Sequence, residues 1–160
     1  MPTFTFVAPT IADTQAIAEV MGRVVHGGEV IELTSDLGGG KTTFMKGFAR
    51  GMGVTEVVQS PTFNICLIHK GTKDRELHHF DFYRLNEPGI MRAELAESLA
   101  QPNAVVAIEW SDIVHDILPT DRVTVKISVP EEEKRVITID CNQEYIAKTL
   151  YDYQHNGHIA

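Results

Sequence analysis

The stretch that decides the fold reads Ser35-Asp36-Leu37-Gly38-Gly39-Gly40-Lys41-Thr42-Thr43. A short apolar run precedes it and predicts a strand over residues 30–34. After it, apolar residues at four-residue spacing (Phe44, Phe48 and Met52) predict a helix over residues 41–52. A strand, a glycine-rich turn and a helix that opens on Lys-Thr are together typical of a phosphate-binding P-loop.

The residue types of this stretch suit the binding of phosphate. Successive backbone N–H groups must converge on the phosphate oxygens, so side chains should be absent where the chain passes closest. The N-terminus of the following helix adds unpaired donors and the positive end of its dipole. We expect Lys41 to reach the β- and γ-phosphates and the Thr42 hydroxyl to bind Mg²⁺. The expected ATP-binding residues of the loop are Gly38, Gly39, Gly40, Lys41, Thr42 and Thr43.

One position departs from the P-loop pattern, because the usual first glycine is Ser35 here. Serine is small and the backbone donors lie further along, so the change puts the angles of the turn in question more than the anion site. The alternative interpretation is a glycine-rich turn that caps an ordinary α/β helix. The flanking strand and helix favour the P-loop.

The composition is that of an ordinary globular domain. The chain has 160 residues, of which 43% are apolar and 22% charged, and we expect one domain over residues 1–151 and a loose polar tail over residues 152–160. No apolar run approaches the ~20 residues of a membrane span, and a signal-peptide layout is absent, so we expect a cytoplasmic protein. Cys66 and Cys141 lie far apart in strand-like runs and are expected to be buried thiols.

Acidic residues outnumber basic ones. The chain has 22 Asp and Glu against 14 Lys and Arg, and a formal net charge of −8. Binding of nucleic acid by neutralising several phosphates needs a surplus of Lys and Arg. The charge therefore disfavours strong direct binding of tRNA or DNA by the isolated chain.

The pattern of the remaining chain predicts a three-layer α/β fold of the P-loop NTPase type, with a mainly parallel central sheet and antiparallel edge strands. A capping box from Thr10 to Asp13 opens a helix, in which Ile11 either contacts the adenine or only packs in the core. A hairpin of residues 121–129 and 135–140 is expected on the edge of the sheet. The other expected strands are 3–7, 63–68, 76–83 and 104–110, and the other expected helices are 87–101 and 143–151.

The run Ala104–Trp110 is the second informative stretch. A continuous apolar run that ends in an acid is typical of a central parallel strand whose tip faces a ligand crevice. Glu109 at that tip is expected to handle Mg²⁺ or the attacking water, with an ordinary surface acid as the alternative. Trp110 either covers the active site or belongs to the core.

Asp81 is the other candidate carboxylate. It shares one strand face with His79 and Tyr83, and it is either directed at a metal or a partner for Arg84. The adjacent histidines 78 and 79 lack a third ligand at suitable spacing, so packing or pairing is favoured over metal binding.

A hydroxyl-bearing loop follows the P-loop helix. Ser60 and Thr62 flank a proline, at the position from which many P-loop proteins project a switch segment towards the γ-phosphate. A turn that only leads into the next strand is an equal competitor.

Taken in order, the P-loop, Ser60-Pro61-Thr62, the run from His79 to Arg84 and Ile108-Glu109-Trp110 resemble the TsaE (YjeE) family over roughly residues 5–140. These are small bacterial ATPases of the tRNA threonylcarbamoyladenosine pathway. The family P-loop reads Gly-Asp-Leu-Gly-Ala-Gly-Lys-Thr-Thr-Phe, so this chain differs at Ser35 and Gly39.

The resemblance implies a cytoplasmic protein that binds ATP with Mg²⁺ and hydrolyses it slowly when isolated. It also implies TsaB and TsaD as partners, through which tRNA is contacted, while the isolated chain is expected to be monomeric. Carried over, Lys41 holds phosphate, Thr42 binds the metal, and Ser60 and Thr62 sense the nucleotide. Asp81 and Glu109 become the metal-shell or catalytic carboxylates.

The expected mechanism is in-line attack of water on the γ-phosphate, with Glu109 or Asp81 orienting the water. Arg84 could act as an internal arginine finger, and Lys134 or Arg135 either touches the nucleotide or is a solvated charge. A small-molecule or nucleotide kinase is the main alternative, although the scattered arginines form no lid-like cluster. A GTPase is disfavoured because no Asn-Lys-x-Asp motif occurs. A nucleotide-regulated assembly factor without enzymatic activity stays open.

Overall fold

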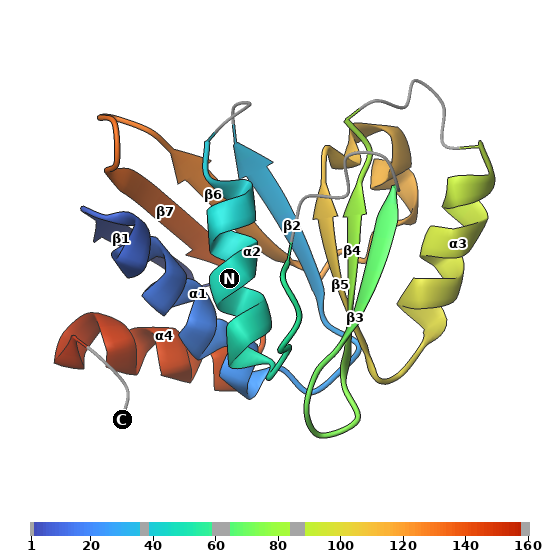
Figure 1. The fold of residues 1–160 in the computed structure, drawn as a ribbon, viewed down its shortest axis with the longest axis horizontal. Coiled ribbons are helices and arrows are strands. Elements are labelled where there is room, and N and C mark those ends of the chain that lie inside the picture. Colours follow the sequence, from blue (N-terminus) through green and yellow to red (C-terminus); the bar gives the residue numbers. More distant parts are fainter. Residues whose placement is uncertain (1, 36–38, 59–64, 84–88, 158–160) are drawn as a thin grey trace.

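The computed structural model describes residues 2–35, 39–58, 65–83 and 89–157. Strands and helices alternate along much of the chain (Figure 1). The strands are β1 (Thr3–Ala8), β2 (Val30–Ser35), β3 (Cys66–Lys70), β4 (Glu76–Asp81), β5 (Ala104–Glu109), β6 (Val123–Ser128) and β7 (Arg135–Asp140). The helices are α1 (Ile11–Val24), α2 (Lys41–Gly51), α3 (Gly89–Ala100) and α4 (Glu144–Asn156), with a 3-10 helix η1 (Ser111–Ile117).

The seven strands form one sheet in the order β1-β7-β6-β2-β5-β4-β3. The central pairs β6–β2, β2–β5 and β5–β4 are parallel, and the outer pairs β1–β7, β7–β6 and β4–β3 are antiparallel. This confirms the predicted sheet. The β6–β7 hairpin, however, is not on the edge as predicted, because β1 pairs with β7 from Thr3 to Ala8 and becomes the edge strand itself.

The strand β2 lies in the middle of the parallel part of the sheet. Its residues Val30 to Leu33 are buried, as expected for a strand with neighbours on both edges and helices on both faces. The strands β2, β4 and β5 are parallel, so their carboxyl ends lie at the same end of the sheet, where α2 also begins (Figure 1). Open α/β sheets bind ligands at the carboxyl ends of their strands.

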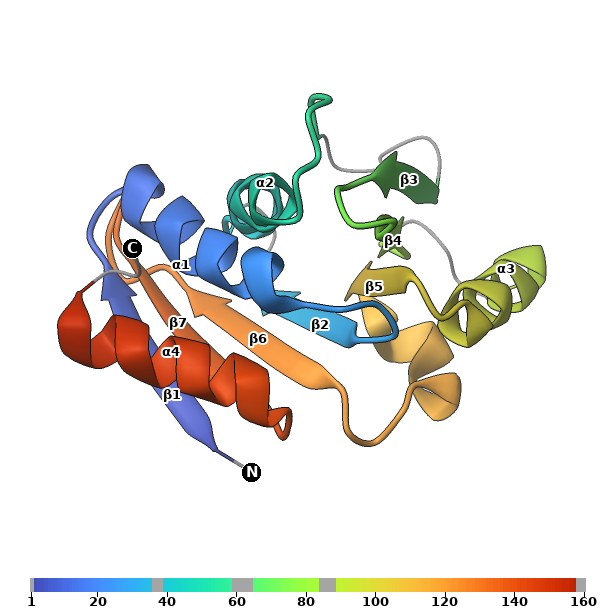
Figure 2. The same ribbon diagram turned by 90° about the horizontal axis from the view of Figure 1, so that it is seen from below.

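Helices cover both faces of the sheet and complete the predicted three layers. The helices α1, α2 and α4 share one buried core with the sheet, and α3 and η1 pack against β2, β4 and β5 on the other face (Figure 2). Phe44 and Phe48 of α2 are fully buried in the first core. Their burial fixes α2, and with it the loop before α2, against the sheet.

Glycines allow α1 and α2 to lie very close to each other. A Cβ atom at Gly22 would overlap the carbonyl oxygen of Phe48, and one at Gly47 would overlap that of Gln15. Side chains at either glycine would force the two helices apart. The close contact adds a second constraint on the position of α2.

Helix α4 corrects the predicted C-terminal boundary. The sequence predicted that the helix ends at Tyr151 and that a loose tail covers residues 152–160. The helix continues to Asn156 and ends before Gly157, which has a φ of 76°. Tyr153 packs edge-to-face on Phe6 of β1, with 5.9 Å between ring centroids, so this part of the chain buries apolar surface.

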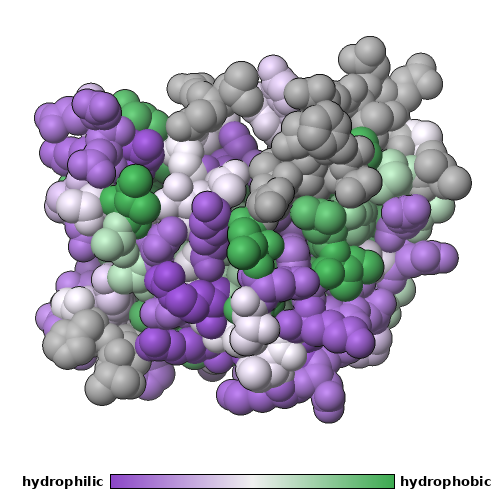
Figure 3. Space-filling view, in the orientation of Figure 1, coloured by the Kyte–Doolittle hydropathy of each residue, from purple (hydrophilic) through white to green (hydrophobic). Residues whose placement is uncertain are grey.

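No helix among the described residues is long and apolar enough to cross a membrane. The face shown in Figure 3 is largely polar, with separate apolar patches. Both cysteines are free; Cys141 is buried as predicted, and Cys66 is only half-buried. Burial raises the pKa of the Cys141 thiol to about 11 and that of the Cys66 thiol to about 12.

Candidate functional site

The glycine-rich loop between β2 and α2 (residues 36–40) ends at Gly40, in a conformation that favours glycine. Gly40 has a φ of 101° and a ψ of 17°, in the left-handed region where a side chain is strained. A Cβ at Gly40 would also lie 3.1 Å from Nε of Arg135. Gly39 is buried beside it, whereas Gly38 lies outside the described residues.

Helix α2 begins at Lys41 with its first backbone N–H groups turned to the loop. Within the described part of the chain no side chain caps this end, and the first turn contains no acidic residue. The first N–H groups of a helix lack partners inside the helix, and the helix dipole adds partial positive charge at the same place. This end of α2 is therefore suited to an anion.

The Lys41 side chain is buried at the same place and crosses the loop. Its exposed fraction is 7%, and its Nζ donates to the Ser35 carbonyl at 3.3 Å. The same Nζ lies 4.8 Å from the centroid of the Trp110 ring, which is a cation–π contact. Ser35 accepts the hydrogen bond from Lys41 through its backbone carbonyl, so any residue at position 35 could supply this acceptor.

Asp81 and Glu109 come together at the tips of two adjacent strands. They are direct register partners in the parallel β4–β5 ladder, and the Phe82 N–H donates to the Glu109 carbonyl at 3.1 Å. Register partners point to the same face of a sheet. That face is the one covered by α2, because Ala107, two residues before Glu109, packs in the same core as Phe44.

His79 is a further residue of this site. Its Nε2 lies 2.5 Å from Oε2 of Glu109, and both side chains are buried, with exposed fractions of 0% and 3%. The alternation of β4 predicts that His79 shares the face of Asp81. Its contact with Glu109 depends on the pairing of β4 with β5, which is distant in sequence, and no local pattern indicates it.

Trp110 turns the chain out of β5 in a strained conformation. Its φ of 55° and ψ of 54° are in the left-handed region, which is uncommon for a bulky residue. Its half-buried ring contacts Tyr83, with 4.8 Å between centroids, and Ser111 after it donates to the buried Glu32 carboxylate. The ring also packs against the core on the α3 side of the sheet, so the core interpretation of Trp110 holds in part, and its role in covering an active site stays a prediction.

Glu32 of β2 holds the turn at Trp110 and Ser111 in place. Burial raises the pKa of Glu32, but hydrogen bonds from Ser111 and Arg122 and the charge of Arg122 outweigh it and hold the pKa below its usual value. The Arg122 Nε donates to Glu32 Oε1 at 2.9 Å. The ionised carboxylate therefore holds Ser111 and, next to it, Trp110.

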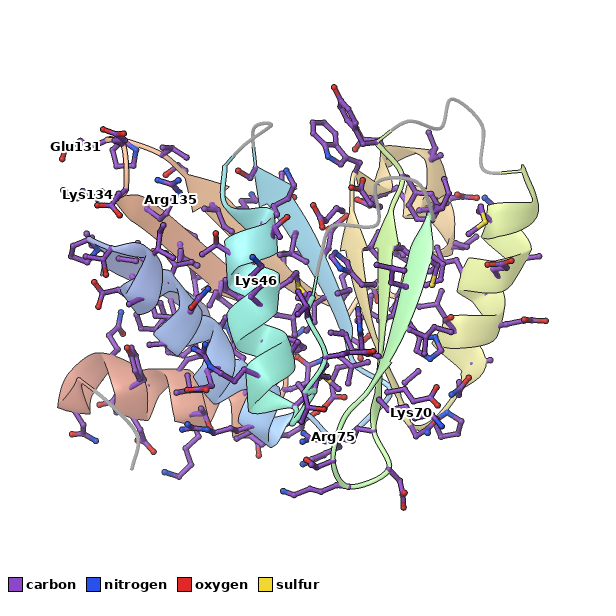
Figure 4. All side chains as sticks on the ribbon, in the orientation of Figure 1. Lys46, Lys70, Arg75, Glu131, Lys134 and Arg135 are labelled. Atoms are coloured by element: carbon purple, nitrogen blue, oxygen red, sulfur yellow. The ribbon has the colours of Figure 1, made fainter. Side chains whose placement is uncertain are left out.

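Arg135 holds the glycine-rich loop from the other side. It begins β7, and its Nε donates to the Gly39 carbonyl at 3.1 Å while Nη1 donates to the carbonyls of Glu132 at 2.9 Å and Lys134 at 3.0 Å. Figure 4 shows Arg135 between the β6–β7 turn and the start of α2, with Lys134 and Glu131 further out. The sequence predicted only that Arg135 contacts the nucleotide or is a solvated charge, and it did not predict this contact with the loop.

The structure thus brings together four predicted residues, Lys41, Asp81, Glu109 and Trp110. Thr42 and Thr43 lie beside them in the first turn of α2. Ile11 is the first residue of α1 with an exposed fraction of 49%, so it is not a core residue, and its contact with adenine stays a prediction. Outside the described residues lie Ser60, Thr62 and Arg84.

The donor set at the site fits Mg²⁺ bound together with phosphate. Thr42, Asp81 and Glu109 offer oxygen atoms, which Mg²⁺ prefers. In the described ranges no group of three or more His, Cys, Asp or Glu side chains could hold a metal alone. Mg²⁺ usually takes one or two carboxylates and completes its shell with water and substrate phosphates.

Comparison with known proteins gives consistent matches. The family model of the threonylcarbamoyl adenosine biosynthesis protein TsaE matches residues 8–137. A tRNA threonylcarbamoyladenosine biosynthesis protein TsaE from Bacillus subtilis (strain 168) is 36% identical over 129 residues, 79% of this chain and 78% of its own length. The protein of the same name from Treponema pallidum (strain Nichols) is 34% identical over 133 residues, 83% of this chain and 97% of its own length.

The fold agrees with these matches. A crystal structure of YdiB from Bacillus subtilis superimposes with a TM-score of 0.76 at 27% sequence identity, and the match covers 98% of this chain and 97% of that one. The sequence and fold similarities extend over most of the chain. The chain therefore belongs to the TsaE family of tRNA threonylcarbamoyladenosine biosynthesis proteins.

Proposed function

We propose that this chain binds ATP with Mg²⁺ and hydrolyses it to support threonylcarbamoylation of adenosine in tRNA. One observation supports this most: β5 ends at Glu109, and the next residue, Trp110, has its ring 4.8 Å from Nζ of Lys41, the first residue of α2. A cation, the N–H groups at the start of a helix and carboxylates at the carboxyl ends of neighbouring strands are the parts that phosphoryl transfer from ATP needs.

Binding begins with the phosphates at the start of α2. The backbone N–H groups of residues 39–43 donate to the phosphate oxygens, and the left-handed Gly40 lets the loop curve around them. Lys41 leaves the Trp110 ring and the Ser35 carbonyl to bind the β- and γ-phosphates. The exchange is favourable because a charged phosphate is a stronger acceptor than a carbonyl or a ring face.

Mg²⁺ would be held by the Thr42 hydroxyl and by Asp81 or Glu109. When bound, it neutralises negative charge on the phosphates. The two carboxylates differ in their surroundings, because Glu109 is buried and bound to His79, whereas Asp81 is partly exposed and accepts from the Tyr83 N–H at 3.0 Å. We assign Glu109 to the attacking water and Asp81 to the metal.

Hydrolysis then follows as in-line attack of that water on the γ-phosphorus. Glu109 orients the water and accepts its proton, and the phosphate–ADP bond breaks on the opposite side. Lys41 and the start of α2 stabilise the charge that develops on the phosphate oxygens. Lys41 and Glu109 are buried, and the exclusion of bulk water around them strengthens their interactions with the charges of the reaction.

The partners we propose are TsaB and TsaD, in the cytoplasm. A chain with a net charge of −8 is poorly suited to hold tRNA alone, and partner proteins can supply the basic surface. ATP turnover would then serve repeated cycles of the modification.

Purified variants test this function. Lys41→Ala should abolish ATP hydrolysis, and Thr42→Ala should weaken its dependence on Mg²⁺, in assays with and without the two partner proteins. Unchanged turnover in both variants would refute the site. Full tRNA modification with a non-hydrolysable ATP analogue would instead support a nucleotide-regulated assembly factor, and phosphoryl transfer to a metabolite would support a kinase.

A further inference from the structure

We infer that His79 is a positioning residue that holds the Glu109 carboxylate in the orientation needed for hydrolysis. The inference rests on the proposed function, in which Glu109 orients the attacking water. It starts from the contact of 2.5 Å between His79 Nε2 and Glu109 Oε2, which joins two buried side chains at the tips of β4 and β5.

The direction of this hydrogen bond depends on the His79 tautomer. A carboxylate only accepts hydrogen bonds, so the tautomer that can position one is the tautomer with its proton on Nε2. The other ring nitrogen, Nδ1, is buried and has no hydrogen-bond partner among the described residues. A bare nitrogen at Nδ1 is tolerated better there than a buried N–H without an acceptor. The ring is thus oriented by its contact with Glu109.

His79 also restricts what Glu109 can do. In the described part of the chain it is the only hydrogen-bond partner of the Glu109 carboxylate. Holding Oε2 restricts the rotation of the carboxylate and so fixes the direction in which Oε1 is presented. A residue that acts in this way lowers the cost of ordering the carboxylate during the reaction.

Packing alone does not explain a histidine at this position. Its neighbours on this face of the sheet are core residues such as Leu77 and Ala107, and a buried polar ring with one unpaired nitrogen costs free energy that an apolar residue avoids. Such a group in a native structure calls for an explanation, and a role at a functional site is one that P-loop chemistry beside it would supply.

The neighbouring His78 provides a matched control. It is also buried on β4, but alternation places it on the opposite face of the sheet. Both of its ring nitrogens have other partners, with Nδ1 at 2.7 Å from Ser98 Oγ and Nε2 at 2.9 Å from Glu76 Oε1. Its replacement perturbs the same strand without touching Glu109.

The test compares His79→Leu, His79→Gln and His78→Leu in the full chain. We expect single-turnover hydrolysis of Mg-ATP to fall by about tenfold or more in His79→Leu, since loss of a partner that orients a ligand or catalytic group typically has this effect. His79→Gln keeps an N–H donor at a similar reach and should recover most of the rate. His78→Leu should keep the rate within about twofold of the wild type, whatever its effect on thermal stability.

Two further measurements separate positioning from a general structural defect. The Kd for an ATP analogue should stay within about threefold in both His79 variants, because the phosphate-binding groups are intact. In crystals of His79→Leu with this analogue, the Glu109 carboxylate should change rotamer or lose defined density. An unchanged Glu109 conformation, or an equal loss of rate in His78→Leu, would overturn the inference.

A double-mutant cycle connects the effect to Glu109. When Glu109 is already replaced by Gln, the change His79→Leu should lower the rate no further, because the partner that it positions is gone. Additive losses would contradict positioning. If Glu109→Gln and Lys41→Ala lower hydrolysis but His79→Leu does not, the inference fails and the proposed function stands; if none of the three does, the proposed function itself fails.

Discussion

Replacement of Arg135 tests how the glycine-rich loop is held in shape for phosphate. Arg135→Met keeps much of the aliphatic stem and removes the donor to the Gly39 carbonyl at 3.1 Å and the donors to the β6–β7 turn. The loop would then lose its described connection to β7. Because the backbone N–H groups of this loop bind phosphate in our proposal, nucleotide affinity should fall.

The size of the effect follows from the contact with Gly39. A hydrogen bond from a charged donor contributes about 1.5–3 kcal/mol, and we take about 1 kcal/mol because Arg135 is half-buried. Since about 1.4 kcal/mol changes an affinity tenfold, the Kd for Mg-ADP should rise about fivefold. Calorimetric titration at fixed ionic strength measures this change directly.

Two controls separate hydrogen bonding from charge. Lys134→Met removes the neighbouring positive charge. Within the described residues the Lys134 side chain makes no hydrogen bond to the glycine-rich loop, so this variant should change the Kd by less than about twofold. Arg135→Lys keeps the charge but not the guanidinium fork, and should resemble Arg135→Met more than the wild type. Equal losses in Lys134→Met and Arg135→Met, or no loss in either, would refute the reasoning.

Two other predictions concern stability. Glu32→Gln should destabilise the chain by about 2 kcal/mol at pH 7, because the charged hydrogen bond to Arg122 is lost. The folded-state pKa of Glu32 is lowered, so this difference should be complete above the ordinary value of 4.5 and should be lost as the pH falls from 4.5 through the lower folded-state pKa. Denaturant unfolding at a series of pH values from 7 downward measures the decline, and a pH-independent difference would contradict the assignment. Gly40→Ala should cost about 1–2 kcal/mol from the left-handed backbone at φ 101° and should also weaken nucleotide binding; an unchanged midpoint of unfolding would show that this conformation is not required.

The sequence predicted those parts of the site that depend on local patterns. The glycine-rich stretch, the apolar strand before it and the spacing of Phe44 and Phe48 predicted β2 and α2 correctly. The apolar run before Glu109 predicted β5 as a central parallel strand. In each case one segment carries both the propensity and the burial pattern, so no knowledge of its neighbours is needed.

The parts that sequence reasoning missed depend on pairings between distant segments. Arg135 reaches Gly39 only because β6 lies beside β2, and His79 reaches Glu109 only because β4 lies beside β5. The edge position of β1 likewise follows from its pairing with β7. The length of α4 follows from the packing of Tyr153 on Phe6, which a polar C-terminal composition conceals.

The most direct test of the whole account is the position of Lys41 in crystals grown with Mg²⁺ and a non-hydrolysable ATP analogue. Its Nζ now lies 4.8 Å from the centroid of the Trp110 ring. We predict that the triphosphate occupies the start of α2 and that Nζ leaves the ring to lie about 3 Å from a β- or γ-phosphate oxygen. A nucleotide bound elsewhere, or a Lys41 that still rests on Trp110 beside a bound triphosphate, would contradict the account.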